Sequence, residues 1–395
     1  MSTEILLINA GSSSVKYQVI DADDEKVLAT GLIQRIGDEV GTIDHTVDGV
    51  THHQDRGFPN HGRALTVMTQ MFDEFGPSLS DVKAVAHRTV HGGDRFNETT
   101  LINDSVIETL KELSPLAPLH NPPGIAGIEA AMKALPDVPH VAVFDTAFFT
   151  TLPAEAYTYA ISTEISQKYG VRRYGFHGTS HDFVSHRVAE FLGRPYEELN
   201  QIVCHLGNGA SISAIQKGVA IETSMGLTPL QGLVMGTRSG DIDPGIHAYL
   251  GRVLDTDLAG VDTLLNKQSG MLGLTSVTDF RDLMELIDAG DARAKLGFDV
   301  YVHRLVFYIG AYIALLGGID AVTFTAGVGE NNPRLREAIV QRLEHLGLTV
   351  DPAVNDPRSK EPRRISAADG KVAVLVIPTN EELQMARYAK AAIGA

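Results

Sequence analysis

Hydrophobic and polar positions alternate between a strand-like and a helix-like period, which predicts a mixed α/β protein. Short apolar runs bounded by turn residues predict strands. These runs are Ile5–Ile8, Val15–Ile20, Val82–His87, Val141–Phe144, Ile202–His205, Ala210–Ile215, Val322–Thr325 and Val372–Ile377. Apolar faces of helical period lie between them, at residues 183–192 and 335–346. We also expect one long, largely buried helix over residues 291–316.

Two segments of the chain repeat the same pattern. Residues 5–20 and 202–215 each read as an apolar strand, a turn of small residues and an alternating strand, and Gly11 aligns with Gly207. A third strand follows each pair, over 26–33 and 218–222. Chance similarity is the alternative, because Gly/Ser turns are common. We favour a duplicated fold in which two similar domains flank a cleft.

Composition narrows the class of protein. The chain has 33 basic and 49 acidic residues and a formal charge of −16, so we expect neither nucleic acid nor an anionic membrane as a partner. A single cysteine, Cys204, excludes an intrachain disulfide and is typical of a reducing compartment. The start lacks a signal-peptide pattern. The run between Arg304 and Asp320 is shorter than the ~20 apolar residues that span a bilayer. We expect a cytoplasmic protein.

Three turns rich in small residues are candidates for binding phosphate. They are Asn9–Ser14, His205–Gly209 and Gly327–Asn331, and Lys16 follows the first of them. Small residues let backbone N–H groups crowd an anion. None of the turns matches a P-loop or a complete dinucleotide fingerprint, so a nicotinamide enzyme is disfavoured. A hairpin turn would explain each one alone, but three together favour a site for phosphate.

Arginine, histidine and aspartate form a second set of candidates. Arg88 ends an apolar strand and Arg238 lies in a glycine-rich loop, where a guanidinium suits a carboxylate or a phosphate. Asp145 ends the strand 141–144, a usual position for catalytic groups in open α/β sheets. Its alternative is a structural carboxylate. His177 and His181 have a metal-binding spacing, but a loop between them disfavours zinc.

Two helix starts have an ordinary structural reading. Ser180 is the expected N-cap of the helix after His177. Residues Thr379–Glu382 match the capping box T-x-x-E before a final helix. That capping box explains Glu382 and leaves Glu381 as a candidate cation ligand, with stabilisation of the helix dipole as the alternative.

Nine segments, in order and nearly end to end, resemble the acetate kinase family. They read NAGSSSVKY from Asn9, HRTVHGG from His87, APLHNPP from Ala117, FDTAF from Phe144, RRYGFHGTSH from Arg172, HLGNGAS from His205, GLTPLQGLVMGTRSGDIDPG from Gly226, GVGEN from Gly327 and PTNEE from Pro378. The resemblance implies the duplicated α/β fold shared by actin, Hsp70 and sugar kinases. It also implies ATP/ADP, Mg²⁺ (with Mn²⁺ as the alternative ion), acetate and acetyl phosphate as substrates, and a homodimer.

The resemblance assigns roles by position. It makes Asp145, Arg88, Arg238 and His177 catalytic, and Arg88, Val90, Leu119, Phe176 and Pro229 the acetate site. It gives the nucleotide Lys16, His205, Leu206, Gly207, Asn208, Gly209, Asp279, Phe280, Arg281, Gly327, Val328, Gly329, Glu330 and Asn331, and it gives the metal Asn9 and Glu381. The implied domains are 1–150 with the helix 381–395, and 151–380.

The chain departs from the family pattern at two places. Phe149-Thr150 replaces His-Gln after FDTAF, and Gln231 replaces an acidic residue before GLVMG. The expected chemistry is transfer of the γ-phosphate of ATP to acetate. Because a carboxylate is already ionised, it needs no general base, and we expect Asp145 to act through magnesium or orientation. The alternatives are a propionate or butyrate kinase, or a non-catalytic actin-like nucleotide-binding protein.

Overall fold

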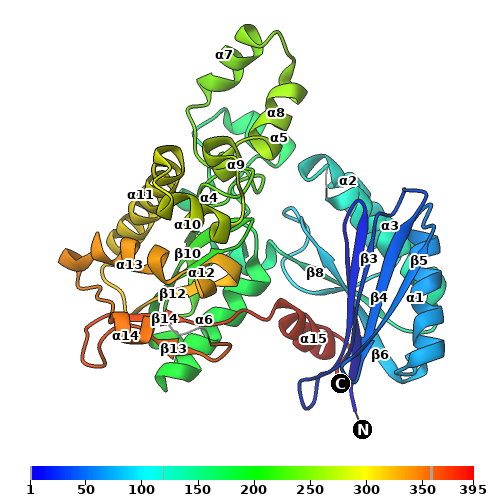
Figure 1. Cartoon of the computed structure of the whole chain (residues 1–395). Helices are drawn as coiled ribbons and strands as arrows, with labels where there is room; N and C mark the ends of the chain where they lie inside the picture. Colours follow the sequence, from blue (N-terminus) through cyan, green and yellow to red (C-terminus); the bar gives the residue numbers. More distant parts are fainter. Residues whose placement is uncertain (1, 119, 356–358) are drawn as a thin grey trace. The chain divides into compact units, whose positions relative to one another are not determined.

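The computed structural model describes residues 2–118, 120–355 and 359–395 and divides into two compact units (Figure 1). Unit 1 comprises Met1–Thr150 and Asn380–Ala395, and unit 2 comprises Thr151–Thr379. The final segment of the chain therefore groups with unit 1. Each unit has its own sheet and its own buried core.

Unit 1 is built on an eight-stranded sheet in the order β5-β4-β3-β2-β1-β6-β8-β7. The strands from β5 to β1 pair antiparallel, whereas β1, β6 and β8 are parallel. Their bounds are β1 Glu4–Ala10, β2 Ser14–Asp21, β3 Lys26–Gln34, β4 Gly41–Val47, β5 Val50–Arg56, β6 Val82–Thr89, β7 Thr100–Leu101 and β8 His140–Phe144.

The helices of unit 1 cover this sheet with their apolar faces. They are α1 His61–Phe75, α2 Asp104–Glu112, α3 Asn121–Ala134 and α15 Glu381–Ala392. The α1 face places Leu65, Met68 and Phe72 against the buried strand residues Leu6 and Ile33. The helix α15 contacts β1, β6 and β8, so its first turn is held near the ends of the parallel strands.

Unit 2 repeats this architecture with a six-stranded sheet in the order β11-β10-β9-β12-β14-β13. Its strands are β9 Asn200–Leu206, β10 Ala210–Gln216, β11 Val219–Thr223, β12 Ala321–Thr325, β13 Arg363–Arg364 and β14 Ala373–Val376. Its helices are α4 Ala154–Tyr157, α5 Thr163–Tyr169, α6 Gly178–Leu192, α7 Gly245–Val253, α8 Leu258–Lys267, α9 Gly270–Thr275, α10 Phe280–Asp288, α11 Ala292–Leu316, α12 Ala326–Asn331, α13 Pro333–Gln341 and α14 Pro352–Asn355.

The six strands of the unit 2 sheet have the same topology as six strands of the unit 1 sheet, to which β4 and β5 are added at one edge. This shared arrangement confirms the predicted duplication. Three antiparallel strands, β3-β2-β1 in unit 1 and β11-β10-β9 in unit 2, are continued by two parallel strands. A short antiparallel strand closes each sheet, β7 beside β8 and β13 beside β14. The aligned glycines Gly11 and Gly207 both lie in the turn between the first two strands of their unit. The chain is thus an α/β protein with two mixed sheets.

The long helix α11 belongs to the core of unit 2. By length and composition it is the one helix of the described chain that is apolar enough to cross a membrane. It packs against α9, α10, α13, β9 and β10, and its buried side chains include Tyr301, Leu305, Ile309 and Tyr312. Contacts on several sides are typical of a core helix.

Three local predictions are wrong. The final helix is capped by Asn380, whose side chain accepts from Leu383 N, because the Thr379 hydroxyl lies 2.7 Å from that of Ser180. Ser180 is not an N-cap but lies inside α6, which begins at Gly178 after His177. The segment 327–331 is part of the short helix α12 rather than a turn.

Candidate functional site

Arg88 and Asp145 meet where two neighbouring parallel strands of unit 1 end. Arg88 lies near the end of β6, and Asp145 directly follows β8. The guanidinium donates from Nε to Oδ1 at 3.0 Å and from Nη2 to Oδ2 at 2.8 Å. Asp145 is only 2% exposed, and its charge raises the pKa of the Arg88 guanidinium. The pair is a bidentate, charge-assisted contact of the kind that fixes a guanidinium plane.

A cavity of about 160 Å³ in unit 1 brings four predicted residues together. Asn9, Lys16, Arg88 and Glu381 line it, as does Glu382, which pairs with Lys16. They come from β1, β2, β6 and the first turn of α15. Because β1 and β2 are paired with Asn9 opposite Lys16, the hairpin presents an amide and an ammonium group to the same space.

The chemistry of this cavity fits a magnesium ion. Burial, and then the nearby carboxylates of Asp145 and Glu382, raise the pKa of Glu381 against the opposing effect of Arg88. A divalent cation would relieve this repulsion. The described residues contain no group of three or more His, Cys, Asp or Glu side chains suited to a metal. Magnesium does not need one, since it is usually held by one or two carboxylates, water and substrate phosphates.

Two predicted residues of unit 2, His177 and Arg238, face the turn that contains Gly209. A Cβ built on Gly209 would lie 3.3 Å from His177 Nε2 and 3.5 Å from Arg238 Nη1. Arg238 Nη1 also donates to the backbone oxygen of Pro229 at 3.3 Å. The His177 ring stacks on His205 with centroids 4.3 Å apart. A guanidinium and an imidazole therefore face the same glycine, an arrangement suited to an anion.

The backbone of His177 is strained. Its φ of 59° lies in the left-handed region, which a non-glycine residue adopts at a cost. The conformation places His177 immediately before the first turn of α6. Strain of this kind persists when the surroundings hold the residue in place, and it is frequent at functional sites.

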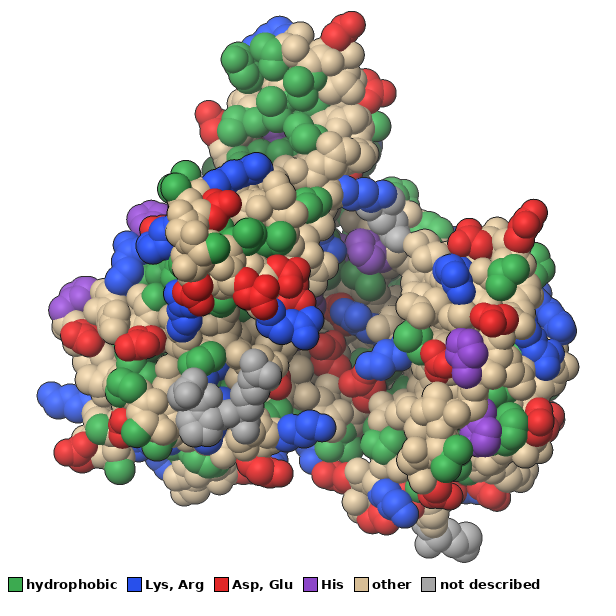
Figure 2. All heavy atoms as spheres, viewed as in Figure 1, with side chains coloured by type: hydrophobic (Ala, Val, Ile, Leu, Met, Phe, Trp, Pro, Cys, Tyr) green, Lys and Arg blue, Asp and Glu red, His purple; other side chains and the backbone are tan. Residues whose placement is uncertain are grey.

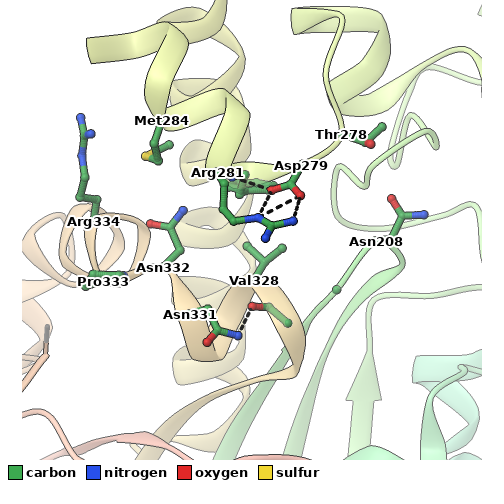
Figure 3. Close-up of a pocket in the computed structure, with 13 residues that line it drawn as sticks. Asn208, Thr278, Asp279, Arg281, Met284, Val328, Asn331, Asn332, Pro333 and Arg334 are labelled. Atoms are coloured by element: carbon green, nitrogen blue, oxygen red, sulfur yellow. Dashed lines mark hydrogen bonds and ion pairs between the residues drawn. The ribbon is translucent and has the colours of Figure 1, made fainter. Parts of the chain in front are cut away.

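A larger pocket of about 860 Å³ in unit 2 has the size of a nucleotide site. The predicted nucleotide residues that line it are Gly207, Asn208, Asp279, Phe280, Arg281, Gly327, Val328 and Asn331 (Figure 3). Asp279 caps α10 through Arg281 N, and its ion pair with the Arg281 side chain helps lower its pKa to about 2. Asn332 caps α13. Two helix N-termini thus border the pocket, where their partial positive charge favours an anion.

Sequence reasoning missed five residues that line this pocket: Thr278, Met284, Asn332, Pro333 and Arg334. All of them lie within a few positions of the predicted segments, and Met284 follows Phe280 by one helical turn. That adjacency is the signal that could have indicated them. In Figure 3, the Asp279–Arg281 pair lies between Thr278 and Val328.

Several predicted residues have other surroundings. Leu206 is fully buried in β9, and Gly329 packs on the Phe324 backbone rather than lining the pocket. Glu330 Oε1 accepts from Thr379 N at 3.2 Å, and burial raises the pKa of this carboxyl. Phe176 is buried and Val90 half-buried, each in its own unit. Leu119 lies outside the described residues.

The two departures from the family pattern fit their surroundings. Phe149 is buried and meets Phe148 edge to face, while Thr150 is exposed. The oxygen Oε1 of Gln231 accepts from the Tyr159 hydroxyl at 2.7 Å. A neutral amide serves as this acceptor without placing another charge in the loop that carries Arg238.

Known structures define the class of protein as an α/β kinase of duplicated fold. The chain superposes on Porphyromonas gingivalis acetate kinase with a TM-score of 0.94 and 40% identity, over 99% of this chain and 100% of that one. A propionate kinase from Francisella tularensis gives a TM-score of 0.93 and 39% identity, over 98% and 99%. The predicted fold class is confirmed.

The sequence comparisons are more specific. The acetate kinase of Clavibacter michiganensis is 53% identical over 390 residues, covering 98% of both chains. A model described as the acetokinase family matches residues 4–387, and the chain belongs to this family.

Proposed function

We propose that this protein transfers the γ-phosphate of ATP reversibly to acetate, giving acetyl phosphate and ADP by direct in-line attack. The prediction of an ATP-dependent acetate kinase is confirmed by the family match and by full-length similarity to acetate kinases. The single observation that carries the mechanism is that each unit holds a guanidinium among predicted catalytic residues, Arg88 beside Asp145 in unit 1 and Arg238 beside His177 in unit 2.

The difficulty of this reaction is the approach of one anion to another. Acetate is ionised at neutral pH, so its oxygen attacks phosphorus without a general base. Arg88 and Arg238 would bind the carboxylate and the migrating phosphoryl group and offset their repulsion. His177 would donate a hydrogen bond to the phosphoryl oxygens. Catalysis then rests on positioning and electrostatics rather than on proton transfer.

Asp145 fits an orienting role in this scheme. Both of its oxygens accept hydrogen bonds from Arg88, which fixes the guanidinium before acetate binds. Val90, Leu119, Phe176 and Pro229 would surround the acetate methyl group.

Asn9 and Glu381 would hold the magnesium ion of Mg·ATP, and Lys16 would face its phosphates. Bound magnesium supplies positive charge that stabilises the charge spread over the phosphoryl oxygens in the transition state. The pocket lined by Asn208, Asp279 and Val328 would hold the nucleoside.

The second candidate is transfer to propionate, because a propionate kinase is similar over nearly the full chain. One methylene in an apolar pocket changes discrimination by only ~1–3 kcal/mol. Both activities are tested by trapping acyl phosphate with hydroxylamine after incubation with Mg·ATP and acetate, propionate or butyrate. We expect acetate-dependent product that disappears in Arg238→Ala. ATP binding without product from any acid would support the non-catalytic alternative.

We also propose a cytoplasmic homodimer that forms through α7 and α8. Hydrophobic side chains gather over these helices in Figure 2, and they include Tyr249, Val253, Leu254 and Leu258, which is 74% exposed. An exposed apolar patch of this kind is typical of a protein interface. Light scattering of the wild type and of Leu258→Glu tests this proposal, and we expect the variant to be monomeric.

A further inference from the structure

Four side chains form a hydrogen-bonded series, here called the relay, that joins His177 to the interior of unit 2. His177 Nδ1 lies 2.9 Å from Ser211 Oγ, and His181 Nε2 lies 2.8 Å from the same oxygen. The other ring nitrogen of His181, Nδ1, lies 2.7 Å from Ser213 Oγ. The order is therefore His177, Ser211, His181, Ser213.

The fold creates the relay from two elements. Ser211 and Ser213 are two residues apart on β10, so their side chains point to the same face of the strand. His181 lies in the first turn of α6 and places its ring between the two hydroxyls. Ser211, Ser213 and His181 are all fully buried.

We propose that Ser211 and His181 are positioning residues that hold His177 as the neutral Nε2–H tautomer, with this N–H directed at the space beside Arg238 in which the anion would bind. The inference rests on the proposed function, since it names what makes His177 a hydrogen-bond donor in that reaction. It assigns no contact with substrate to Ser211 or His181.

Counting the hydrogen-bond donors and acceptors of the relay favours this tautomer of His177. If His181 carries its proton on Nε2, it donates to Ser211, Ser211 donates to His177 Nδ1, and Ser213 donates to His181 Nδ1. Each hydroxyl and the His181 N–H then donates one hydrogen bond within the relay. Because His177 Nδ1 is an acceptor, the neutral His177 ring carries its proton on Nε2.

The opposite arrangement is less favourable. With its proton on Nδ1, His181 would donate to Ser213, and the Ser213 hydroxyl hydrogen would then need another acceptor. His181 Nδ1 is its hydrogen-bond partner among the described residues. A buried donor left without an acceptor is unfavourable, because it has lost its hydrogen bond to water without a replacement. This cost selects the first arrangement at both histidines.

Burial also keeps the relay neutral. Desolvation, and then the nearby His205, lower the pKa of His181 well below its ordinary value. A neutral His181 has one N–H and one acceptor nitrogen, which the proton count requires.

The position of His177 makes its tautomer matter for the reaction. Its Nε2 approaches the same glycine, Gly209, as Arg238 Nη1. An Nε2 without hydrogen would present a lone pair to an anion and repel it. The Nε2–H form donates instead, as the guanidinium does.

Nitrogen NMR of the full-length protein, labelled at the histidine imidazoles, tests the relay. Two-bond ¹H–¹⁵N spectra distinguish the two tautomers, and His177→Gln and His181→Gln identify the signals by their loss. We expect Nε2–H at both histidines in the wild type. Nδ1–H at His177 would overturn the proposal, whether or not any variant folds.

Kinetics of Ser211→Ala supply the second readout. We expect kcat to fall roughly 10- to 100-fold, as when a group that orients a catalytic histidine is lost. The KM for ATP should stay near the wild-type value. Ser211→Thr retains the hydroxyl and should restore most of kcat. Ser185→Ala removes a buried hydroxyl that does not belong to the relay. It is the matched control, and its kcat should be nearly unchanged.

The outcomes separate the two proposals. An unchanged His177 tautomer and unchanged kcat in Ser211→Ala would refute the relay. The expected tautomers in a protein that makes no acyl phosphate would refute the proposed function and leave the relay intact.

Discussion

The carboxylate of Asp145 accepts two parallel hydrogen bonds from Arg88, at 3.0 Å from Nε and 2.8 Å from Nη2. The pair lies at the ends of adjacent parallel strands, and Asp145 is almost wholly buried. Because both oxygens are engaged, the carboxylate is placed to orient a guanidinium. This geometry favours an orienting role for Asp145 over a role in proton abstraction.

Asp145→Asn tests that role. An amide offers one acceptor oxygen and an NH₂ group that opposes the guanidinium, so Arg88 should lose its fixed plane. We expect kcat/KM to fall roughly 10²- to 10³-fold, as when a preorganised donor is removed. Stability should fall by about 2 kcal/mol, less than for a wholly buried pair because the Arg88 side chain is 27% exposed. Acetate titrations and urea unfolding measure the two effects.

The control for this substitution is Asp299→Asn. Asp299 forms an exposed pair with Lys295, and its loss should change stability by less than about 1 kcal/mol and leave activity unchanged. Full activity of Asp145→Asn at saturating Mg²⁺ would mean that Asp145 does not orient Arg88 for catalysis.

Gly209→Ala should block the anion position of unit 2. Its methyl group would lie 3.3 Å from His177 Nε2 and 3.5 Å from Arg238 Nη1, inside the space between these donors. The φ of Gly209 imposes no glycine requirement, so the fold should persist. We expect at least a roughly 10-fold loss of kcat, because small displacements of catalytic groups are costly. Steady-state kinetics and circular dichroism provide the measurements.

Gly310→Ala is the matched control. A Cβ at Gly310 meets no atom within 4 Å, and the residue lies inside α11. Alanine should therefore stabilise the helix by up to ~1 kcal/mol without affecting turnover. Equal activity of the two variants would show that the space over Gly209 is not used in catalysis.

The strands and the duplication could be predicted because their signals are local. Alternation and turn composition define β1, β2, β9 and β10, and the repeat follows by comparing them. The predicted helix caps were wrong because of a tertiary contact. The Thr379 hydroxyl contacts Ser180, which is 199 positions away, so Asn380 caps the last helix instead.

The candidate site also combines features that local sequence signals predict with features that depend on tertiary contacts. Arg88 and Asp145 could be predicted from the strand ends that they occupy, and family resemblance supplied their roles. The relay could not be predicted, because His181 meets Ser211 and Ser213 only when β10 packs beside α6. Those partners are 30 and 32 positions distant in the sequence. A histidine at helical spacing carries no signal for a contact of that kind.

Glu381→Gln should uncouple stability from magnesium. In the wild type, burial and then the carboxylates of Asp145 and Glu382 raise the pKa of Glu381, and a bound cation would offset the repulsion between these carboxylates. We therefore expect Mg²⁺ to raise the Tm of the wild type. The variant should melt higher than the wild type in EDTA and gain little from Mg²⁺. Differential scanning fluorimetry with and without Mg²⁺ measures both effects.

Glu108→Gln provides the comparison, since Glu108 pairs with Lys111 on the surface of unit 1. It should respond to Mg²⁺ as the wild type does. An equal Mg²⁺ response in Glu381→Gln would remove Glu381 from the proposed metal site.

The buried pair of His87 and His140 should make stability depend on pH. His87 Nε2 lies 2.9 Å from His140 Nδ1, and His140 Nε2 donates to the backbone oxygen of Leu135 at 3.0 Å. Desolvation lowers the pKa of both rings, and the neighbouring His140 lowers that of His87 further. The folded protein therefore keeps both rings neutral at a pH where the unfolded chain is protonated.

The direction in which stability changes with pH follows from the number of protons that the folded and unfolded states bind. Below the unfolded pKa of about 6.5 the unfolded chain binds more protons, so stability is complete above that pH and is lost as the pH falls. Each buried ring contributes a slope of up to ~1.4 kcal/mol per pH unit. His140→Gln should therefore flatten the dependence of the urea midpoint on pH between about pH 5 and 7. His53→Gln should steepen it, because Asp44 raises the pKa of His53 and protonation there favours the fold. Equal slopes in the two variants would contradict this assignment.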